Sequence, residues 1–275
     1  ADRYGPYVVL ELFSLAMHLR REAIEDAFID AGLDVRQFVV RADKRVMTQE
    51  GFRLPRTARS PGKVTVAEHG VRFHVDLAAG HKTGFFCDQR DNRRALAELA
   101  GGRTVLDLCC YTGGFACHAA APGEAKAVAA VDLDEKALAV ARENAALNEA
   151  DIDFTHADAF DFLREASAAG RTWEVVVLDP SKFVPRRADL ETGLRKYADL
   201  NRLAAAVVAP GGLLLTCSCS GAVDLATFQD TVGRAARQAG RRMQVFRVTG
   251  AGPDHPVDAQ TPESAYLKAL WGRMD

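Results

Sequence analysis

The 275-residue sequence lacks several features that would set it apart from ordinary globular proteins. It has no apolar run of membrane-spanning length and opens with no secretory signal, so no membrane role is predicted. Its six cysteines follow neither a disulfide framework nor the spacing of a zinc site, which favours a reduced, cytoplasmic protein without a bound metal. The formal net charge of -2 shows no overall positive field, so a nucleic-acid partner would have to meet a local basic patch.

The pattern of apolar residues divides the chain into two predicted domains. Residues 1–62 are expected to form a small α/β appendage that ends in an exposed, arginine-containing linker over residues 51–62. Within it we predict strands at residues 7–13, 35–40 and 45–48, and one amphipathic helix at residues 14–31. Residues 63–275 are expected to form the main domain, which opens with a β-hairpin at residues 63–76 around Glu68-His69-Gly70.

Strand and helix patterns alternate from residue 103, which predicts an α/β fold with a seven-stranded, doubly wound Rossmann-like sheet. Before it, Asp91 is predicted to cap a helix that runs to Leu99. A loop rich in Gly and Pro, without a helix, joins the last two strands, so the final strand is expected to be antiparallel. The predicted strands are residues 104–109, 127–131, 153–155, 174–178, 212–216, 243–247 and 265–270, and the predicted helices are residues 114–121, 134–148, 159–169, 188–208 and 224–239.

One stretch, residues 105–115, is expected to organise ligand binding. A short apolar strand there breaks into a turn with two adjacent glycines, Gly113 and Gly114, and an alanine-rich helical segment follows. Such a unit places backbone N–H groups and a helix N-terminus around a ligand. Asp107, near the strand end, has the charge to hold an amine. The alternative is a strand–turn–helix that binds nothing, because isolated glycine motifs occur often by chance.

Three further strands are predicted to end in an aspartate, where an open α/β sheet binds its ligand. Asp132 is positioned to accept hydrogen bonds from both hydroxyls of a ribose, whereas Asp134 suits a helix N-cap better. Asp158 is compatible with an adenine amino group or with a helix cap, and both interpretations stay open. Asp179, in an Asp-Pro step, could bind the polar edge of a base or belong to an ordinary turn.

The fifth strand of the predicted sheet ends in two alternating cysteines, Cys217 and Cys219. A free thiol is mostly protonated at neutral pH, so a nucleophilic cysteine needs a nearby cation or dipole, for which Lys182 and the following helix are candidates. Free cysteines are usually small core residues, and this is the interpretation preferred for Cys217. For Cys219, which a Ser-Gly step follows into a loop, a functional role is preferred.

Eight short motifs, in this order and spacing, resemble those of class I S-adenosylmethionine-dependent methyltransferases, and among them the RlmI-type large-subunit ribosomal RNA (cytosine-5) methyltransferases. The resemblance covers nearly the whole chain. The motifs are HKTGF at 81–85, DQRD at 88–91, CYTGGF at 110–115, DPSKF at 179–183, KYADLN at 196–201, CSCSG at 217–221, DHPV at 254–257 and YLK at 266–268.

The resemblance implies S-adenosylmethionine as cofactor and ribosomal RNA, or a ribosomal subunit, as partner, with a homodimer left open. It implies that Cys219 is the nucleophile and that Asp179 grips the cytosine. Together with Lys182, the candidate cation named above, they form the expected catalytic set. The segment around residue 107 would hold the methionine end, Asp132 the ribose and Asp158 the adenine, while Arg90 would close over the cofactor. The full set of expected cofactor-binding residues is Arg90, Asp107, Cys109, Tyr111, Thr112, Gly113, Gly114, Phe115, Asp132, Leu133, Asp158, Ala159 and Asp179.

Two departures from the family pattern are visible in the sequence. The family usually has Asp-Pro-Pro-Lys-Phe, and here Ser181 replaces the second proline. Family members also carry an N-terminal PUA-like RNA-binding domain, which this sequence does not include. RNA binding is therefore expected to depend on the arginines of residues 51–62 and on four further basic residues, Arg186, Arg187, Arg195 and Lys196. The alternative is that all these charged residues only form a solvated face.

Two other functions remain open at this point. The first is methylation of another base atom, such as N7 or N2 of guanine, which needs no thiol. The second is a non-catalytic assembly factor that binds cofactor and RNA, because a fold does not fix a function. A nicotinamide dehydrogenase is disfavoured, because Gly113-Gly114 lacks the G-x-G-x-x-G spacing.

Overall fold

The computed structural model describes residues 1–54, 61–78, 84–261 and 264–275. Its contacts divide the chain into two compact units, one of Ala1–Glu68 with Arg72–Cys87 and one of His69–Val71 with Asp88–Asp275. The predicted boundary at residue 62 lies ahead of the hairpin, most of which these contacts assign to the first unit. Residues 55–60 of the predicted linker, and residues 81–83 of the HKTGF motif, lie outside the described residues.

The first unit contains a three-stranded sheet in the order β1-β2-β3. β1 (Asp2–Tyr4), which the sequence analysis did not predict, pairs antiparallel with β2 (Tyr7–Glu11), and β3 (Gln37–Arg41) pairs parallel with β2. The predicted strands at 7–13 and 35–40 are therefore confirmed apart from their ends. Val8, Leu10 and Val40 of these strands join Phe52 in the core of the unit, so the start of the predicted exposed linker is buried.

Two predictions for this unit are wrong. The single helix at residues 14–31 is two helices, α1 (Leu15–Leu19) and α2 (Arg21–Asp30), which meet at Arg20. α1 buries no side chain, so no packing forces it to continue the axis of α2, which packs Ile24 and Phe28 on the core. The strand predicted at residues 45–48 is instead the helix α3 (Lys44–Glu50).

Local capping explains why α3 forms where β-branched residues suggested a strand. The Asp43 carboxylate accepts a hydrogen bond from the Arg45 N–H at 2.7 Å, which caps the first turn. Gly51 follows the last turn with a φ of 72°, a left-handed conformation that ends helices and favours glycine. These two signals outweigh the strand preference of Val46 and Thr48.

The predicted hairpin is confirmed as β4 (Lys63–Glu68) and β5 (Val71–Asp76), which form a two-stranded sheet. Its two turn residues, His69 and Gly70, have φ values of 48° and 87°. Two successive left-handed residues are what a two-residue hairpin turn requires.

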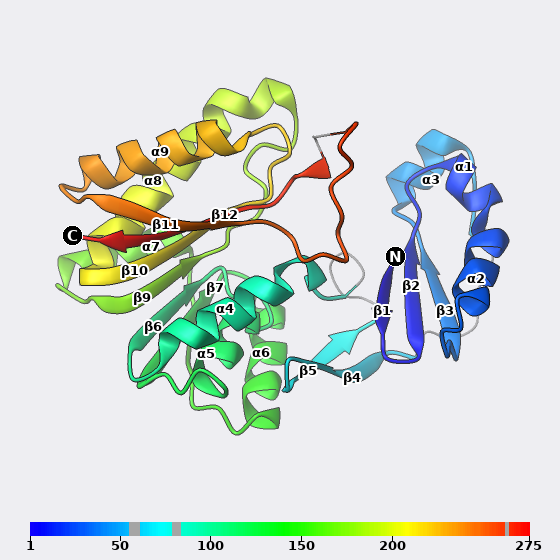
Figure 1. Cartoon of the computed structure of the whole chain (residues 1–275), viewed down its shortest axis with the longest axis horizontal. Coiled ribbons are helices and arrows are strands. Elements are labelled where there is room, and N and C mark those ends of the chain that lie inside the picture. The colour runs from blue at the N-terminus through cyan, green and yellow to red at the C-terminus, as the bar shows by residue number, and fades with distance from the viewer. Residues whose placement is uncertain (55–60, 79–83, 262–263) are drawn as a thin grey trace. The chain divides into compact units, whose positions relative to one another are not determined.

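The second unit is built on the predicted seven-stranded sheet, in the order β11-β12-β10-β9-β6-β7-β8 (Figure 1). All its pairs are parallel except those of β12, which lies antiparallel between β10 and β11, as predicted for the final strand. The strands are β6 (Thr104–Leu108), β7 (Ala127–Asp132), β8 (Asp153–His156), β9 (Trp173–Leu178), β10 (Val208–Ser218), β11 (Met243–Thr249) and β12 (Lys268–Met274).

The helices of this unit lie where the sequence predicts them, except at the start. The chain enters α4 (Arg90–Ala100) through a 3-10 turn, η1 (Cys87–Gln89), so Gln89 is the N-cap and Asp91 lies in the first turn. The prediction that Asp91 caps this helix is therefore wrong. The other elements are α5 (Gly114–Ala120), α6 (Glu135–Leu147), α7 (Ala159–Ala168), η2 (Arg187–Asp189), α8 (Leu190–Val207) and α9 (Leu225–Gln238).

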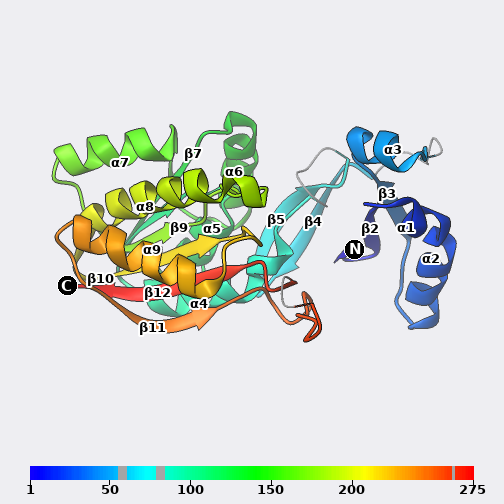
Figure 2. The ribbon, with the colours of Figure 1, turned by 90° about the horizontal axis from the view of Figure 1, so that it is seen from above.

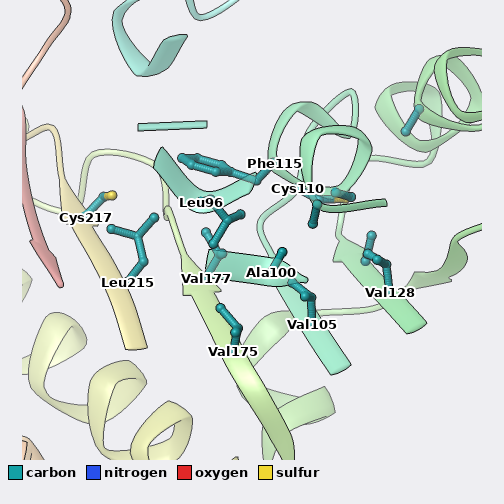
Figure 3. Close-up of a cluster of buried hydrophobic side chains, with 14 of the residues drawn as sticks. Leu96, Ala100, Val105, Cys110, Phe115, Val128, Val175, Val177, Leu215 and Cys217 are labelled. Carbon is teal, nitrogen blue, oxygen red and sulfur yellow. The ribbon is translucent and has the colours of Figure 1, made fainter. Parts of the chain in front are cut away.

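Both faces of the sheet carry hydrophobic clusters, because successive strand residues point to opposite faces. On β6, Val105 packs with side chains of α4, α5 and α6, whereas its neighbour Leu106 packs with side chains of α7, α8 and α9. Figures 1 and 2 show these two groups of three helices on opposite sides of the sheet. Figure 3 shows the first cluster, in which Leu215 and Cys217 of β10 lie on the same face as Val105.

Candidate active site

The parallel strands bring their carboxyl ends to one edge of the sheet. Leu108 of β6 is in register with Leu178 of β9, and Leu178 with Thr216 of β10. On the other side, Leu108 is in register with Val131 of β7. The segments that follow these strands, each of which contains a predicted site residue, therefore leave the sheet side by side.

The loop between β6 and α5 has an unusual backbone. Cys109, Tyr111 and Gly113 have φ values of 60°, 49° and 78°, so left-handed residues alternate with ordinary ones. Such conformations are costly for residues with a side chain and are concentrated at functional sites. A Cβ on Gly113 would also lie 3.3 Å from the Cβ of Ala141 on α6. The backbone angle thus favours glycine at this position, and a side chain would also be tightly packed against α6.

Neighbouring side chains hold this loop in place. The Asn144 side chain of α6 donates to the carbonyl of Thr112 at 2.9 Å, and the Tyr111 N–H donates to Asp132 at 2.7 Å. The remaining predicted residues, Gly114 and Phe115, form the first turn of α5. The loop thus places a helix N-terminus beside the carboxylates at the sheet edge, as predicted.

Asp107 is the most deeply buried of these carboxylates, and one of its oxygens has a clear partner. Oδ2 accepts a hydrogen bond from the Ala116 N–H at 2.9 Å, whereas Oδ1 is buried and has no hydrogen-bond partner. Burial raises the pKa of Asp107 well above its usual range, against the hydrogen bond from Ala116, and the nearby Asp179 and Asp132 raise it further. A buried oxygen of this kind suits a positively charged donor such as the amine of an amino acid.

Four predicted aspartates act electrostatically on the side chain of Cys109. Burial raises its pKa above the usual range of a thiol, and four negative charges add to the effect: Asp132, Asp179, Asp107 and Asp158. The structure therefore brings these four carboxylates together, as the sequence analysis expected. It also makes the Cys109 thiol a poor nucleophile, since only the thiolate reacts readily.

Asp132 and Asp134 have the different surroundings that the sequence analysis expected. Asp134 caps α6, where one oxygen accepts from the Lys136 and Ala137 N–H groups at 2.9 and 3.2 Å. The two oxygens of Asp132 accept from the backbone of Tyr111 and Asp134, one each, and a carboxylate has room for about two acceptor sites more. The side chain of Leu133, between them, is 64% exposed and available to a flat ring.

Asp158 acts as a helix cap, one of the two interpretations left open for it. Its Oδ1 accepts from the Phe160 and Asp161 N–H groups at 2.8 and 3.3 Å, and Ala159 begins α7. These bonds use one oxygen, so capping leaves Oδ2 for a second partner such as an adenine amino group.

The segment after β11 is fastened to the start of α4. Arg90 donates to Asp254 at 2.7 Å, and the Tyr266 hydroxyl donates to Asp88 at 2.6 Å. Burial would raise the pKa of Asp254, but hydrogen bonds from Arg90 and His255 lower it below its usual value. Three motifs that are far apart in sequence, DQRD, DHPV and YLK, thus meet in space.

The two cysteines of the CSCSG motif have different environments. Cys217 is fully buried in the hydrophobic cluster of Figure 3, as preferred from the sequence, and burial raises its pKa well above the usual range. Cys219 lies just beyond the last residue of β10 and is partly exposed. Of the two thiols, Cys219 is therefore the one that a substrate can approach.

A lysine of β12 interacts with this thiol. Lys268, at the start of β12, is paired in register with Ser218 and interacts electrostatically with Cys219 and with Lys182. Burial lowers the pKa of Lys268 to about 8, although Cys219 and Asp224 act in the opposite direction. Lys182, the cation suggested by the sequence, is exposed. The N-terminus of α9, the other candidate, is capped by Asp224, which accepts from the Thr227 N–H at 2.7 Å.

The loop that carries Asp179 and Lys182 packs closely on α8. A Cβ on Gly193 would lie 2.7 Å from the carbonyl oxygen of Phe183, which is closer than real Cβ atoms approach an oxygen. The Phe183 ring also packs on Tyr197 with ring centroids 4.9 Å apart. Gly193 is thus needed for the distance between the helix and this loop.

We expect Gly193→Ala to lower the free energy of unfolding by about 1–3 kcal/mol, because the added methyl displaces the loop or the helix. The matched control is Gly233→Ala in α9, where the nearest atom to an added Cβ is Arg237 Nη1 at 3.9 Å. That variant should gain roughly 0.5–1 kcal/mol from better helix propensity. Urea denaturation measures both, and equal effects of the two substitutions would disprove the packing role of Gly193.

Two of the four basic residues proposed to contact RNA are paired within the protein. Arg186 forms a bidentate pair with Asp189, and Arg195 pairs with Glu191 at 2.9 Å. Lys196 lies 5.9 Å from the centre of the Phe183 ring. Arg187 is exposed, so the surface beside the Asp179 loop keeps part of its positive charge.

Sequence reasoning missed Arg93 of α4, whose buried side chain lies against the glycine turn. A Cβ on Gly114 would lie 3.0 Å from Arg93 Cδ, and the positive charge of Arg93 acts on Asp107. The residue fell within a predicted helix and drew no attention. A charged residue at a buried position of that amphipathic helix was the available signal.

Comparison with known proteins accounts for this arrangement. Residues 58–273 match the model of the S-adenosylmethionine-dependent methyltransferase family. The chain belongs to this family. Its cofactor is therefore S-adenosylmethionine, for which the buried Asp107 oxygen, the glycine turn and the Asp132 carboxylate provide fitting groups.

Two curated relatives carry the name ribosomal RNA large subunit methyltransferase I. The protein of Aeromonas hydrophila subsp. hydrophila is 41% identical over 98% of this chain and 69% of its own length. That of Photobacterium profundum is 38% identical with the same coverage. A crystal structure of a methyltransferase complexed with SAH superposes on this chain with a TM-score of 0.84. The two chains are 23% identical, and the match covers 99% of this chain and 70% of the other. This similarity supports the fold. Among the residues that the structure describes, no helix is both long enough and apolar enough to cross a membrane.

Proposed function

We propose that this methyltransferase acts on large-subunit ribosomal RNA and forms 5-methylcytosine, with Cys219 as a covalent nucleophile. The RNA class follows the names of relatives that are about 40% identical over almost the whole chain. The choice of cytosine and of its C5 atom rests on one observation. A partly exposed thiol, Cys219, follows β10, and β10 pairs with β9, the strand that Asp179 follows. A cytoplasmic location agrees with this substrate.

Cytosine C5 is too weak a nucleophile to take a methyl group directly. In the proposed reaction the Cys219 thiolate adds to C6, which forms the Sγ–C6 bond and makes C5 nucleophilic. When bound, S-adenosylmethionine would supply the methyl group. The C5–methyl bond would form as the bond between the methyl group and the sulfonium sulfur breaks, and S-adenosylhomocysteine would leave with that electron pair. A base removes the C5 proton, the electrons of that C–H bond restore the C5–C6 double bond, and the Sγ–C6 bond breaks to release the thiolate.

The residues around Cys219 have distinct proposed roles in this reaction. Asp179 grips the N3/N4 edge of the cytosine and stabilises the charge that develops on the ring. Lys182 and Lys268 supply positive charge on the thiol side, which favours the thiolate. Because the base edge and C6 must both reach this site, the target nucleotide has to be unpaired or flipped out of a helix.

The cofactor is proposed to lie along the edge defined by β6, β7 and β8. Asp107 binds the amine and the loop from Cys109 to Phe115 encloses the methionine end. Asp132 binds the ribose hydroxyls, Leu133 packs on the adenine, and Asp158 with Ala159 recognises its amino edge. Arg90 holds the segment after β11 over this site through Asp254.

Identification of the methylated nucleoside tests the proposal. The protein is incubated with labelled S-adenosylmethionine and either protein-free large-subunit RNA or the subunit particle, and the RNA is digested to nucleosides. We expect label in 5-methylcytidine. The substrate that is methylated faster, protein-free RNA or the subunit particle, indicates whether methylation precedes or follows assembly of the subunit. Label in N7- or N2-methylguanosine would disprove the cytosine assignment, and RNA binding without transferred label would indicate a non-catalytic assembly factor.

A further inference from the structure

A buried hydrogen-bond network holds the residues on either side of the proposed nucleophile. Tyr197 of α8 is fully buried, and its hydroxyl lies 3.0 Å from the hydroxyl oxygens of both Ser218 and Ser220. These serines are the residues on either side of Cys219. One phenol therefore contacts both neighbours of the thiol and spans the residue between them.

The hydrogen bonds of this network are compatible with the Tyr197 hydroxyl as a donor to Ser220. The Val184 N–H donates to the Ser220 hydroxyl oxygen at 3.1 Å, which fills one acceptor site there. Ser218 donates to Tyr197, so Tyr197 can donate in turn to Ser220. Burial raises the pKa of the Tyr197 phenol, so it keeps the proton that this arrangement requires.

Lys268 also holds this segment. Its ammonium group donates to the carbonyl oxygens of Ser220 and Tyr266 at 2.6 and 2.7 Å. The two residues that flank Cys219 are thus held by α8, by β12 and by Val184 of the Asp179 loop. Since the hydrogen bonds to Ser218 and Ser220 are buried, the segment has little freedom to shift.

We propose that Tyr197 is a positioning residue for Cys219: its hydroxyl fixes Ser218 and Ser220 and so directs the thiol toward the base that Asp179 holds. This inference depends on the role proposed for Cys219. The attack of sulfur on C6 requires the two atoms at about 3–3.5 Å in a defined direction, and a displacement of about 1 Å can cost about 100-fold in rate. A chain turn directly after a strand would not hold a side chain so accurately without such bonds.

Tyr197→Phe tests the inference because it removes only the hydroxyl. The ring packs on Phe183 and Phe228, with centroid distances of 4.9 and 5.5 Å, and phenylalanine retains this packing. We expect kcat to fall between about 10-fold and 100-fold while KM for RNA and Kd for S-adenosylmethionine stay within about 2-fold. A purely structural role would instead lower the melting temperature and leave kcat of the folded protein unchanged.

A double-mutant cycle with Ser220→Ala sharpens this test. Because the two hydroxyls act through one network, the double variant should lose much less in kcat than the product of the two single losses. Thr231→Val, which removes a partly buried hydrogen bond of a hydroxyl group within α9, is the matched control. Its effect on kcat should combine with that of Tyr197→Phe by simple multiplication.

The outcomes separate this inference from the proposed function. Wild-type kcat in Tyr197→Phe, or simple multiplication with Ser220→Ala, overturns the positioning role alone. Full turnover in Cys219→Ala overturns the covalent mechanism, and the positioning role with it.

Discussion

Replacement of Cys219 by alanine is expected to lower the rate of methyl transfer to ribosomal RNA by about 1,000-fold or more, because the Sγ–C6 bond can no longer form. The affinity for S-adenosylmethionine should be unchanged, since the proposed cofactor residues lie on the other strand ends. Single-turnover transfer of labelled methyl groups measures the first quantity and calorimetry the second. Turnover within about 10-fold of the wild type would exclude a covalent mechanism.

Cys217→Ala is the matched control for this variant. Cys217 lies two residues before Cys219, but its side chain is fully buried in the hydrophobic cluster on β10. Removal of its sulfur leaves a small cavity, so we expect a loss of about 1 kcal/mol in stability and methyl transfer within about 3-fold of the wild type. Comparable inactivation by both substitutions would show that the loss reflects a disturbed strand rather than a missing nucleophile.

Asp132→Ala is expected to raise the Kd for S-adenosylmethionine by roughly 100-fold, or about 2.7 kcal/mol. The carboxylate is proposed to bind two ribose hydroxyls, and it also accepts the Tyr111 N–H that helps to shape the glycine turn. Both effects weaken cofactor binding in the same direction. Isothermal titration calorimetry without RNA measures the change.

Asp134→Ala provides the control for this prediction. Asp134 is the same residue type two positions later, but its carboxylate caps α6. Loss of the cap should lower stability by about 1 kcal/mol and leave the Kd for S-adenosylmethionine within about 2-fold. If Asp134→Ala weakened cofactor binding as much as Asp132→Ala, the ribose assignment would fail.

The sheet and its ligand-binding edge could be predicted because they depend on patterns along the chain. Apolar runs such as that of β6 alternate with helical segments, and the aspartates that follow the strands converge once the strands are parallel. The different burial of Cys217 and Cys219 also follows from the chain, since the first lies inside a strand and the second at its end. These features require no knowledge of which residues meet across the fold.

Other features depend on contacts between distant residues and could not be predicted. The sequence placed Tyr197 in a predicted helix without assigning it a role. Only the fold shows that its hydroxyl contacts two serines more than 20 positions away. The interaction of Lys268 with Cys219 likewise needs the antiparallel pairing of β12 with β10. A charged residue at the start of an apolar strand was its one sequence signal. The helix α3 was missed for another reason, because the caps at Asp43 and Gly51 were overlooked.

The covalent adduct itself is the most direct test of the account. In RNA that contains 5-fluorocytidine, the fluorine at C5 cannot leave as a proton does, so the elimination step is blocked and the Sγ–C6 bond persists. We predict that the wild-type protein with S-adenosylmethionine forms a complex that survives denaturation, and that mass spectrometry of its peptides places the nucleotide on Cys219. Methylation of normal RNA to 5-methylcytidine without such a complex, or an adduct on another residue, would contradict it.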